Sequence, residues 1–206
     1  MKIGIMGGTF DPVHNAHLTA ASKIRELCGL DEVVLMPTNI PPHKSNRKIS
    51  SAQQRLAMLN LALETVPENS GLRVSTIELD RLGTTYTVDT LKQIVMESHT
   101  EDDFYYIIGA DVVFDLINWK DCTTVFQLCS FIAMMRPGFN IRKFDEKISE
   151  LRQVHSVRIS TVEMQQMNIS STELRNHFAH KTEWQVSDQL PPKVFEYILE
   201  NKLYRA

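Results

Sequence analysis

Two glycines followed by two histidines form a cluster near the start of the chain that could bind a phosphate. Residues 7–17 read G-G-T-F-D-P-V-H-N-A-H and follow a short apolar run that is typical of a strand. The glycines let the backbone turn sharply and approach a ligand, and the helix that follows exposes N–H groups at its start. Because His14 and His17 are three residues apart, they share one face of this helix and can contact the same phosphate.

Other interpretations of this cluster remain open. A plain turn with a surface histidine pair explains the same residues, since short motifs have many false positives. The cluster is neither G-x-G-x-x-G nor a P-loop, because it lacks the third glycine and the G-K-[ST] ending. A zinc pair is disfavoured, because the histidines lack an obvious third ligand.

Polar residues later in the chain also suit a nucleotide. A carboxylate such as Asp111, after an apolar run, can accept hydrogen bonds from ribose hydroxyls, and Trp119 can stack on an aromatic ring. Ser171 and Thr172 precede a helical pattern, and Arg175 adds a guanidinium that suits a polyphosphate. Ordinary packing explains a single tryptophan equally well, and an ordinary helix cap explains the hydroxyls.

A basic segment follows the second apolar run of the sequence. Lys44, Arg47, Lys48 and Arg55 concentrate positive charge in a chain whose net charge is -3. Beside a phosphate site, such a patch favours anion binding. A solvated loop with no function is the alternative interpretation.

These clusters need a scaffold, and alternating apolar runs and helical patterns indicate one. Such alternation predicts an α/β fold, a Rossmann-like doubly wound parallel sheet, in which ligands bind beyond the carboxyl ends of the strands. The 206 residues suit a single domain, with an α/β core over about 1–165 and a small C-terminal helical portion over about 166–206. The predicted strands are 3–6, 33–36, 72–79, 104–108, 131–135 and 154–162, and the predicted helices are 15–27, 51–65, 87–97, 171–179 and 191–201.

Composition limits the class of protein. Hydrophobic residues make up 43% and charged residues 23%, as in globular proteins with a core. The negative net charge disfavours nucleic acid as the main partner, and no apolar run is long enough for a membrane span. The three cysteines lack C-x-x-C spacing, and the N-terminus lacks a signal-peptide pattern, so a cytoplasmic protein with reduced thiols is expected. A homo-oligomer is compatible with all of these features.

The order of the motifs resembles that of a known family. The opening G-G-T-F-D-P-x-H-x-x-H is similar to the nucleotidyltransferases with a T/H-x-G-H signature, although Ala16 replaces the usual glycine. Four further segments resemble those of bacterial nicotinate mononucleotide adenylyltransferases, and the resemblance extends from residue 3 to about residue 204. These segments are P-P-H-K at 41–44, T-Y-T-V-D-T at 85–90, G-A-D at 109–111 with Trp119, and I-S-S-T-E-L-R at 169–175.

The resemblance implies roles for individual residues. It assigns catalysis to His14, His17, Lys44 and Arg175. It assigns binding of the mononucleotide to Thr9, Lys44, Tyr86, Thr87, Asp111, Trp119 and Arg136, with backbone N–H groups of the segment 85–91 helping to hold the substrate carboxylate. It assigns ATP binding to Gly7, Gly8, Thr9, Phe10, His14, His17, Gly109, Asp111, Ile169, Ser170, Ser171, Thr172 and Arg175.

The implied reaction joins nicotinate mononucleotide to ATP, with Mg²⁺ arriving on the ATP and pyrophosphate leaving. A phosphate monoester has a second pKa of about 6, so the attacking phosphate needs no general base at neutral pH. Transfer to nicotinamide mononucleotide, to phosphopantetheine or to a cytidylyl substrate is an alternative, as is a nucleotide-binding module without catalysis. An NAD-dependent oxidoreductase is disfavoured by the missing G-x-G-x-x-G.

Overall fold

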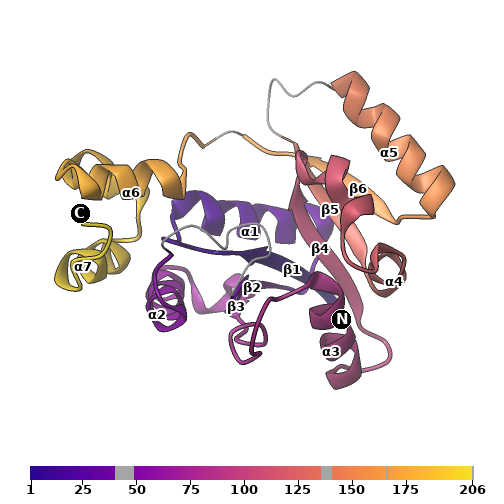
Figure 1. Cartoon of the computed structure of the whole chain (residues 1–206), viewed down its shortest axis with the longest axis horizontal. Helices are drawn as coiled ribbons and strands as arrows, with labels where there is room; N and C mark the ends of the chain where they lie inside the picture. Colours follow the sequence, from indigo (N-terminus) through magenta and orange to yellow (C-terminus); the bar gives the residue numbers. More distant parts are fainter. Residues whose placement is uncertain (40–48, 136–140, 166, 206) are drawn as a thin grey trace.

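A parallel sheet of six strands forms the centre of the molecule (Figure 1). The computed structural model describes residues 1–39, 49–135, 141–165 and 167–205. Every neighbouring pair of strands is parallel, and the strand order is β3-β2-β1-β4-β5-β6. The order reverses between β1 and β4, and this switch point opens a crevice at the carboxyl ends of the strands. The strands are β1 Lys2–Gly8, β2 Glu32–Pro37, β3 Leu72–Val74, β4 Asp103–Gly109, β5 Ser130–Met135 and β6 Ile159–Glu163.

Helices cover both faces of the sheet, which confirms the predicted doubly wound α/β class. Figure 1 shows α6 and α7 at one end of the molecule, near α1 and α2, and α5 at the opposite end. The α-helices are α1 Asn15–Cys28, α2 Ala52–Leu63, α3 Thr87–Glu97, α4 Cys122–Leu128, α5 Ile141–His155, α6 Ser171–Ala179 and α7 Pro192–Glu200. Short 3-10 helices occur at Glu68–Ser70, Val112–Asn118 and Glu183–Gln189.

Alternate residues of the central strands supply two separate hydrophobic cores. Val34 and Met36 of β2 belong to the core that includes residues of α3, α4 and α5 on one face, whereas Val33 and Leu35 belong to the core that includes residues of α1, α2, α6 and α7 on the other. Successive side chains of a strand point to opposite faces, so a strand covered on both faces is apolar throughout. The C-terminal helices therefore share a core with α1 and α2.

The predicted strand over 72–79 is wrong beyond Val74. Only the residues up to Val74 pair with β2, and the chain then forms a turn in which the Asp80 N–H donates to the Thr76 carbonyl at 2.9 Å. Ile77 packs against the core that lies beneath α3, α4 and α5. The alternating pattern therefore reflects burial of an irregular segment and not a longer strand.

The predicted strand over 154–162 begins too early. Helix α5 continues to His155, and β6 begins only at Ile159. The buried residues Phe144, Ile148 and Leu151 of α5 are three and four positions apart, which is the spacing of a helix face. That signal is present in the sequence, although α5 and the short α4 were absent from the predicted elements.

The sequence predicts no membrane span, and the lengths and composition of the described helices can be compared with that expectation. Across the described ranges, none is both long enough and apolar enough to cross a bilayer.

Candidate active site at the switch point

Two cavities meet at the carboxyl ends of β1 and β4. The first has a volume of about 990 Å³ and lies between the residues that follow β1, the start of α1 and the start of α6. The second has a volume of about 670 Å³ and lies between the start of α3 and residues 111–120. Asp111 lines both cavities. Volumes of this size suit small-molecule ligands.

Gly7 and Gly109 let side chains approach the ends of these two strands closely. A Cβ atom on Gly7 would lie 2.7 Å from the Tyr106 hydroxyl, and one on Gly109 would lie 2.6 Å from Oδ1 of Asp111. Real Cβ atoms do not come so close to their neighbours. The glycine at each strand end therefore leaves room for a polar side chain from β4 or from the segment after it.

His14 and His17 lie together at the start of α1 and line the first cavity. Their rings stack with centroids 3.7 Å apart and planes inclined by 23°. His14 is only 5% exposed, and burial lowers its pKa to about 4. Burial and the nearby His14 ring lower the pKa of His17 well below its ordinary value. Both imidazoles are therefore neutral at pH 7, and each offers one N–H donor.

Residues at the start of α6 hold the loop that precedes α1. The Ser171 hydroxyl donates to the Pro12 carbonyl at 2.9 Å, and Nη1 of Arg175 donates to the Asp11 carbonyl at 2.6 Å. Nη2 of Arg175 donates to the Thr172 hydroxyl at 3.1 Å. The start of α6 and the loop before α1 thus form one wall of the first cavity, with the Arg175 guanidinium in it.

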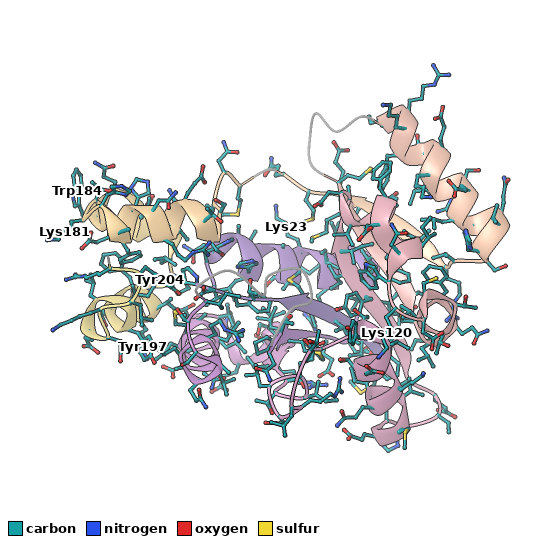
Figure 2. The ribbon with its side chains drawn as sticks, in the orientation of Figure 1. Lys23, Lys120, Lys181, Trp184, Tyr197 and Tyr204 are labelled. Atoms are coloured by element: carbon teal, nitrogen blue, oxygen red, sulfur yellow. The ribbon has the colours of Figure 1, made fainter. Side chains whose placement is uncertain are left out.

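Aromatic rings line the second cavity. Trp119 packs edge-on against Tyr106, with ring centroids 5.8 Å apart, and Tyr86 lies under the Lys120 ammonium, which is 4.3 Å from the ring centroid. Lys120 (Figure 2) also pairs with Asp89 at 3.1 Å. Tyr86 is the residue before α3, and its side chain forms no capping hydrogen bond; the start of a helix generally presents N–H groups that can bind an anion.

A buried carboxylate connects the parts of the second cavity. Glu78 is 4% exposed, and its Oε1 accepts a hydrogen bond from the Thr90 hydroxyl at 2.9 Å. Burial raises the pKa of Glu78, while hydrogen bonds from Thr90, Thr38 and Thr85 act in the opposite direction. The Glu78 side chain thereby joins three segments: Thr38 after β2, Thr85 in the loop before α3, and Thr90 in α3.

The residues assigned to ATP from the sequence all line the first cavity. They are Gly7, Gly8, Thr9, Phe10, His14, His17, Gly109, Asp111, Ile169, Ser170, Ser171, Thr172 and Arg175. Of those assigned to the mononucleotide, Thr9 lines the first cavity, and Tyr86, Thr87, Asp111 and Trp119 line the second. Lys44 and Arg136 lie outside the described residues. Their roles, like those of the other site residues, stay predictions.

Sequence reasoning missed several residues of the two cavities. Lys23 (Figure 2), one helical turn after Ala20 on α1, lines the first cavity, as does Asp11. Glu78 and Lys120 line the second cavity. Lys23 is six positions after His17, which is not one of the spacings of three or four residues that share a helix face, and nothing local to Glu78 marks it as buried.

The assignment of Arg55 to an exposed basic patch is wrong. Arg55 is 2% exposed, and its guanidinium donates to the backbone carbonyls of Thr9 at 2.9 Å and Thr38 at 2.8 Å. A buried guanidinium must have its donors satisfied, and these carbonyls at the ends of β1 and β2 satisfy them. Arg55 therefore forms hydrogen bonds in the protein interior and is not part of an exposed basic surface.

Clusters of metal ligands and free thiols are the other groups that could take part in chemistry. Among the residues that the structure describes, no group of three or more histidine, cysteine, aspartate or glutamate side chains could hold a metal ion. The three cysteines, Cys28, Cys122 and Cys129, are free thiols. None of these cysteines lines either cavity.

Comparison with known proteins gives consistent matches over the whole chain. The family model described as cytidylyltransferase-like matches residues 5–177. A probable nicotinate-nucleotide adenylyltransferase from a Thermoanaerobacter species is 37% identical, and the match covers 100% of this chain and 95% of that protein. One with the same name from Corynebacterium kroppenstedtii is 39% identical, with 98% and 90% covered.

Solved structures match the fold. Plasmodium falciparum nicotinic acid mononucleotide adenylyltransferase complexed with NaAD superimposes with a TM-score of 0.79, and the match covers 98% of this chain and 97% of that one. The same protein complexed with APC gives a TM-score of 0.78. The sequence identity is 21% in both cases, so these structures support the architecture alone.

Proposed function

Because this chain belongs to the cytidylyltransferase-like family, and within it to the nicotinate-nucleotide adenylyltransferases, we propose that it transfers the adenylyl group of ATP to nicotinate mononucleotide. The products are nicotinate adenine dinucleotide and pyrophosphate. The reaction is a step of NAD biosynthesis.

The observation that carries this proposal is the position of Asp111, which lines both cavities at the end of β4. A reaction that joins two nucleotides needs two adjacent sites whose reacting groups meet at their boundary. ATP occupies the first cavity and nicotinate mononucleotide the second. Asp111 accepts hydrogen bonds from ribose hydroxyls at that boundary.

The first cavity suits the triphosphate of ATP. The neutral rings of His14 and His17 donate hydrogen bonds to phosphate oxygens, and Arg175 supplies a fixed positive charge. The starts of α1 and α6 add N–H groups and favourable helix dipoles. The resemblance adds Lys44 to this set.

The second cavity suits the pyridine ring and its carboxylate. Trp119 and Tyr86 offer flat faces for the ring. The first N–H groups of α3, next to Thr87, receive the carboxylate, since the Tyr86 side chain does not cap this helix. The resemblance adds Arg136 as a contact of the mononucleotide. Asp115 and Glu78 make this cavity partly acidic, so these N–H groups matter for holding an anion.

The chemistry needs no general base from the protein. The mononucleotide phosphate has a second pKa of about 6 and is largely dianionic at pH 7. One of its oxygens attacks the α-phosphorus of ATP, and the bond to the oxygen that bridges the α- and β-phosphorus atoms breaks. Pyrophosphate leaves with the electron pair of that bond. His14, His17 and Arg175 stabilise the negative charge that develops on the departing phosphates.

A divalent metal enters with ATP as part of the substrate, and we assign it as Mg²⁺. The ion neutralises charge on the phosphate oxygens when MgATP is bound. Mg²⁺ keeps several waters and takes most of its ligands from phosphates in such sites.

A direct assay tests the proposal. Purified protein is supplied with ATP and Mg²⁺, and with nicotinate mononucleotide, nicotinamide mononucleotide or phosphopantetheine in turn. Pyrophosphate release is followed, and the dinucleotide is identified by mass. We expect the highest kcat/KM with nicotinate mononucleotide. Preference for the amide or for phosphopantetheine would replace the substrate assignment, and binding without turnover of any acceptor would indicate a nucleotide-binding module.

A further inference from the structure

One nitrogen atom of a buried arginine connects the two cavities. Nη1 of Arg55 donates to the Thr9 carbonyl at 2.9 Å and to the Thr38 carbonyl at 2.8 Å. Thr9 lines the first cavity and Thr38 lines the second. Arg55 itself lines neither of them.

The remaining donors of Arg55 hold the chain on both sides of residues 40–48. Nε donates to the Ser50 carbonyl at 3.1 Å, and Nη2 donates to the Asn39 carbonyl at 3.4 Å. Because a guanidinium is rigid and planar, its donors fix the carbonyls that accept from them in one relative arrangement. Arg55 thereby sets the ends of β1 and β2 against each other.

A second contact holds the same loop from the end of the chain. The Tyr204 hydroxyl donates to Oδ1 of Asp11 at 2.7 Å, and the Ser50 N–H donates to Oδ2 at 3.4 Å. Figure 2 shows Tyr204 in the C-terminal segment, beside α6 and α7. Asp11 is 2% exposed, and its charge also attracts Arg55. The carboxylate thus accepts hydrogen bonds from a hydroxyl and a backbone N–H, and it interacts with the Arg55 guanidinium by charge.

We propose that Arg55 is a positioning residue that aligns the two substrate sites with each other, and that Tyr204 supports it through Asp11. This inference rests on the proposed function, because alignment matters only if both cavities hold reactants. The reacting oxygen and phosphorus must meet at the boundary between the cavities. Movement of Thr9 relative to Thr38 separates them without removing a group that touches either substrate.

The proposal predicts a specific kinetic signature. A misplacement of about 1 Å can lower a rate about 100-fold. We therefore expect Arg55→Lys to lower kcat by about 10- to 100-fold, because a lysine ammonium has three donors in a different geometry and cannot reproduce the fork. The KM values for ATP and for the mononucleotide should each stay within about threefold, since their direct contacts remain.

Binding gives a readout that a merely structural role would not change. The dinucleotide product spans both cavities, whereas each mononucleotide occupies one. By calorimetry, Arg55→Lys should bind nicotinate adenine dinucleotide at least about tenfold more weakly, a change of about 1.4 kcal/mol. The Kd values and stoichiometries for an ATP analogue and for nicotinate mononucleotide should be unchanged.

One further variant and two matched controls make the test decisive. Tyr204→Phe removes a single hydroxyl and leaves Asp11 with a missing donor, so we expect a kcat loss of about fivefold or more. If Arg55→Lys does not fold, the kcat of Tyr204→Phe tests the proposal. Arg73→Lys and Tyr197→Phe are the matched controls, because the Arg73 side chain that pairs with Glu32 is 51% exposed and neither Arg73 nor Tyr197 lines a cavity.

The outcomes separate this inference from the proposed function. A wild-type protein that binds both ligands but makes no dinucleotide overturns the proposed function. An active wild-type protein whose Arg55→Lys and Tyr204→Phe variants keep kcat overturns the alignment role. A kcat loss with equal weakening of all three ligands would also overturn it, because that result indicates a general loss of folded protein.

Discussion

The backbone N–H of His14 donates a hydrogen bond to Nδ1 of His17 over 3.3 Å. An imidazole nitrogen that accepts a hydrogen bond carries no proton, so the proton of neutral His17 is on Nε2. The pKa of His17 is lowered by burial and by the neighbouring His14 ring, which keeps the ring neutral. One backbone contact therefore selects the tautomer in which Nε2 of His17 is the donor that a ligand in the first cavity can use.

The first prediction concerns this donor. His17→Ala should lower kcat by about 10²- to 10³-fold, because a preorganised donor to the transition state is lost. His17→Gln should recover part of that loss, since its amide nitrogen can approach the position of Nε2. Steady-state pyrophosphate release gives the rates, and circular dichroism checks that each variant is folded. Near-normal turnover by His17→Ala would refute the role of this residue.

The second prediction concerns the stability of the free protein in acid. The pKa of His14 falls from its ordinary 6.5 to about 4 in the folded state, so the unfolded chain binds more protons between these values. The stability that neutral His14 contributes is therefore fully present above about pH 6.5 and is lost as the pH falls toward 4. Between pH 7 and pH 5 this histidine should account for a loss of about 2 kcal/mol.

Urea unfolding at both pH values measures this loss. His14→Asn lacks the titrating group and should lose less stability than the wild type over the same interval. Equal losses in the two proteins would show that burial of His14 does not control the acid response.

The third prediction uses the two tryptophans as a matched pair. Trp119 lines the second cavity, whereas Trp184 is 70% exposed near the outer end of the C-terminal helices (Figure 2). Trp119→Ala should raise the KM for nicotinate mononucleotide about tenfold, or about 1.4 kcal/mol, with little change in the KM for ATP. Trp184→Ala should change neither constant.

Fluorescence offers an independent check of the same prediction. In Trp184→Phe, Trp119 is the only tryptophan left, so nicotinate mononucleotide should change the emission on binding. An emission that does not respond to saturating mononucleotide would argue against stacking on Trp119.

The fourth prediction tests the close approach at the end of β1. A Cβ on Gly7 would lie 2.7 Å from the Tyr106 hydroxyl, and the next nearest atom of that ring is 3.5 Å away. Gly7→Ala should therefore lower kcat/KM by about 10- to 100-fold by displacing the backbone. Gly7→Ala with Tyr106→Phe removes the clashing oxygen and should regain most of the activity. A double variant as impaired as Gly7→Ala would exclude this clash as the cause.

The sequence alone was enough for the architecture and for the local motifs. Alternating strand and helix patterns determine a doubly wound sheet, and the residues that cap or begin a helix act within one turn of their neighbours. Residues 7–17 and 169–175 are therefore recognisable from the sequence as candidate segments for phosphate binding, and residues of both line the first cavity. Helix α5 carried the same kind of local signal in Phe144, Ile148 and Leu151, and it could have been predicted.

Only the tertiary structure decided which of these groups meet. Tyr204 reaches Asp11 across 193 positions and Arg175 reaches it across 164, and no local pattern encodes such contacts. Arg55 looks like a member of a charged patch in the sequence, yet the carbonyls at the ends of β1 and β2 enclose it. The reversal of strand order between β1 and β4 places Asp111 at both cavities, because parallel strands bring distant strand ends to one edge of the sheet.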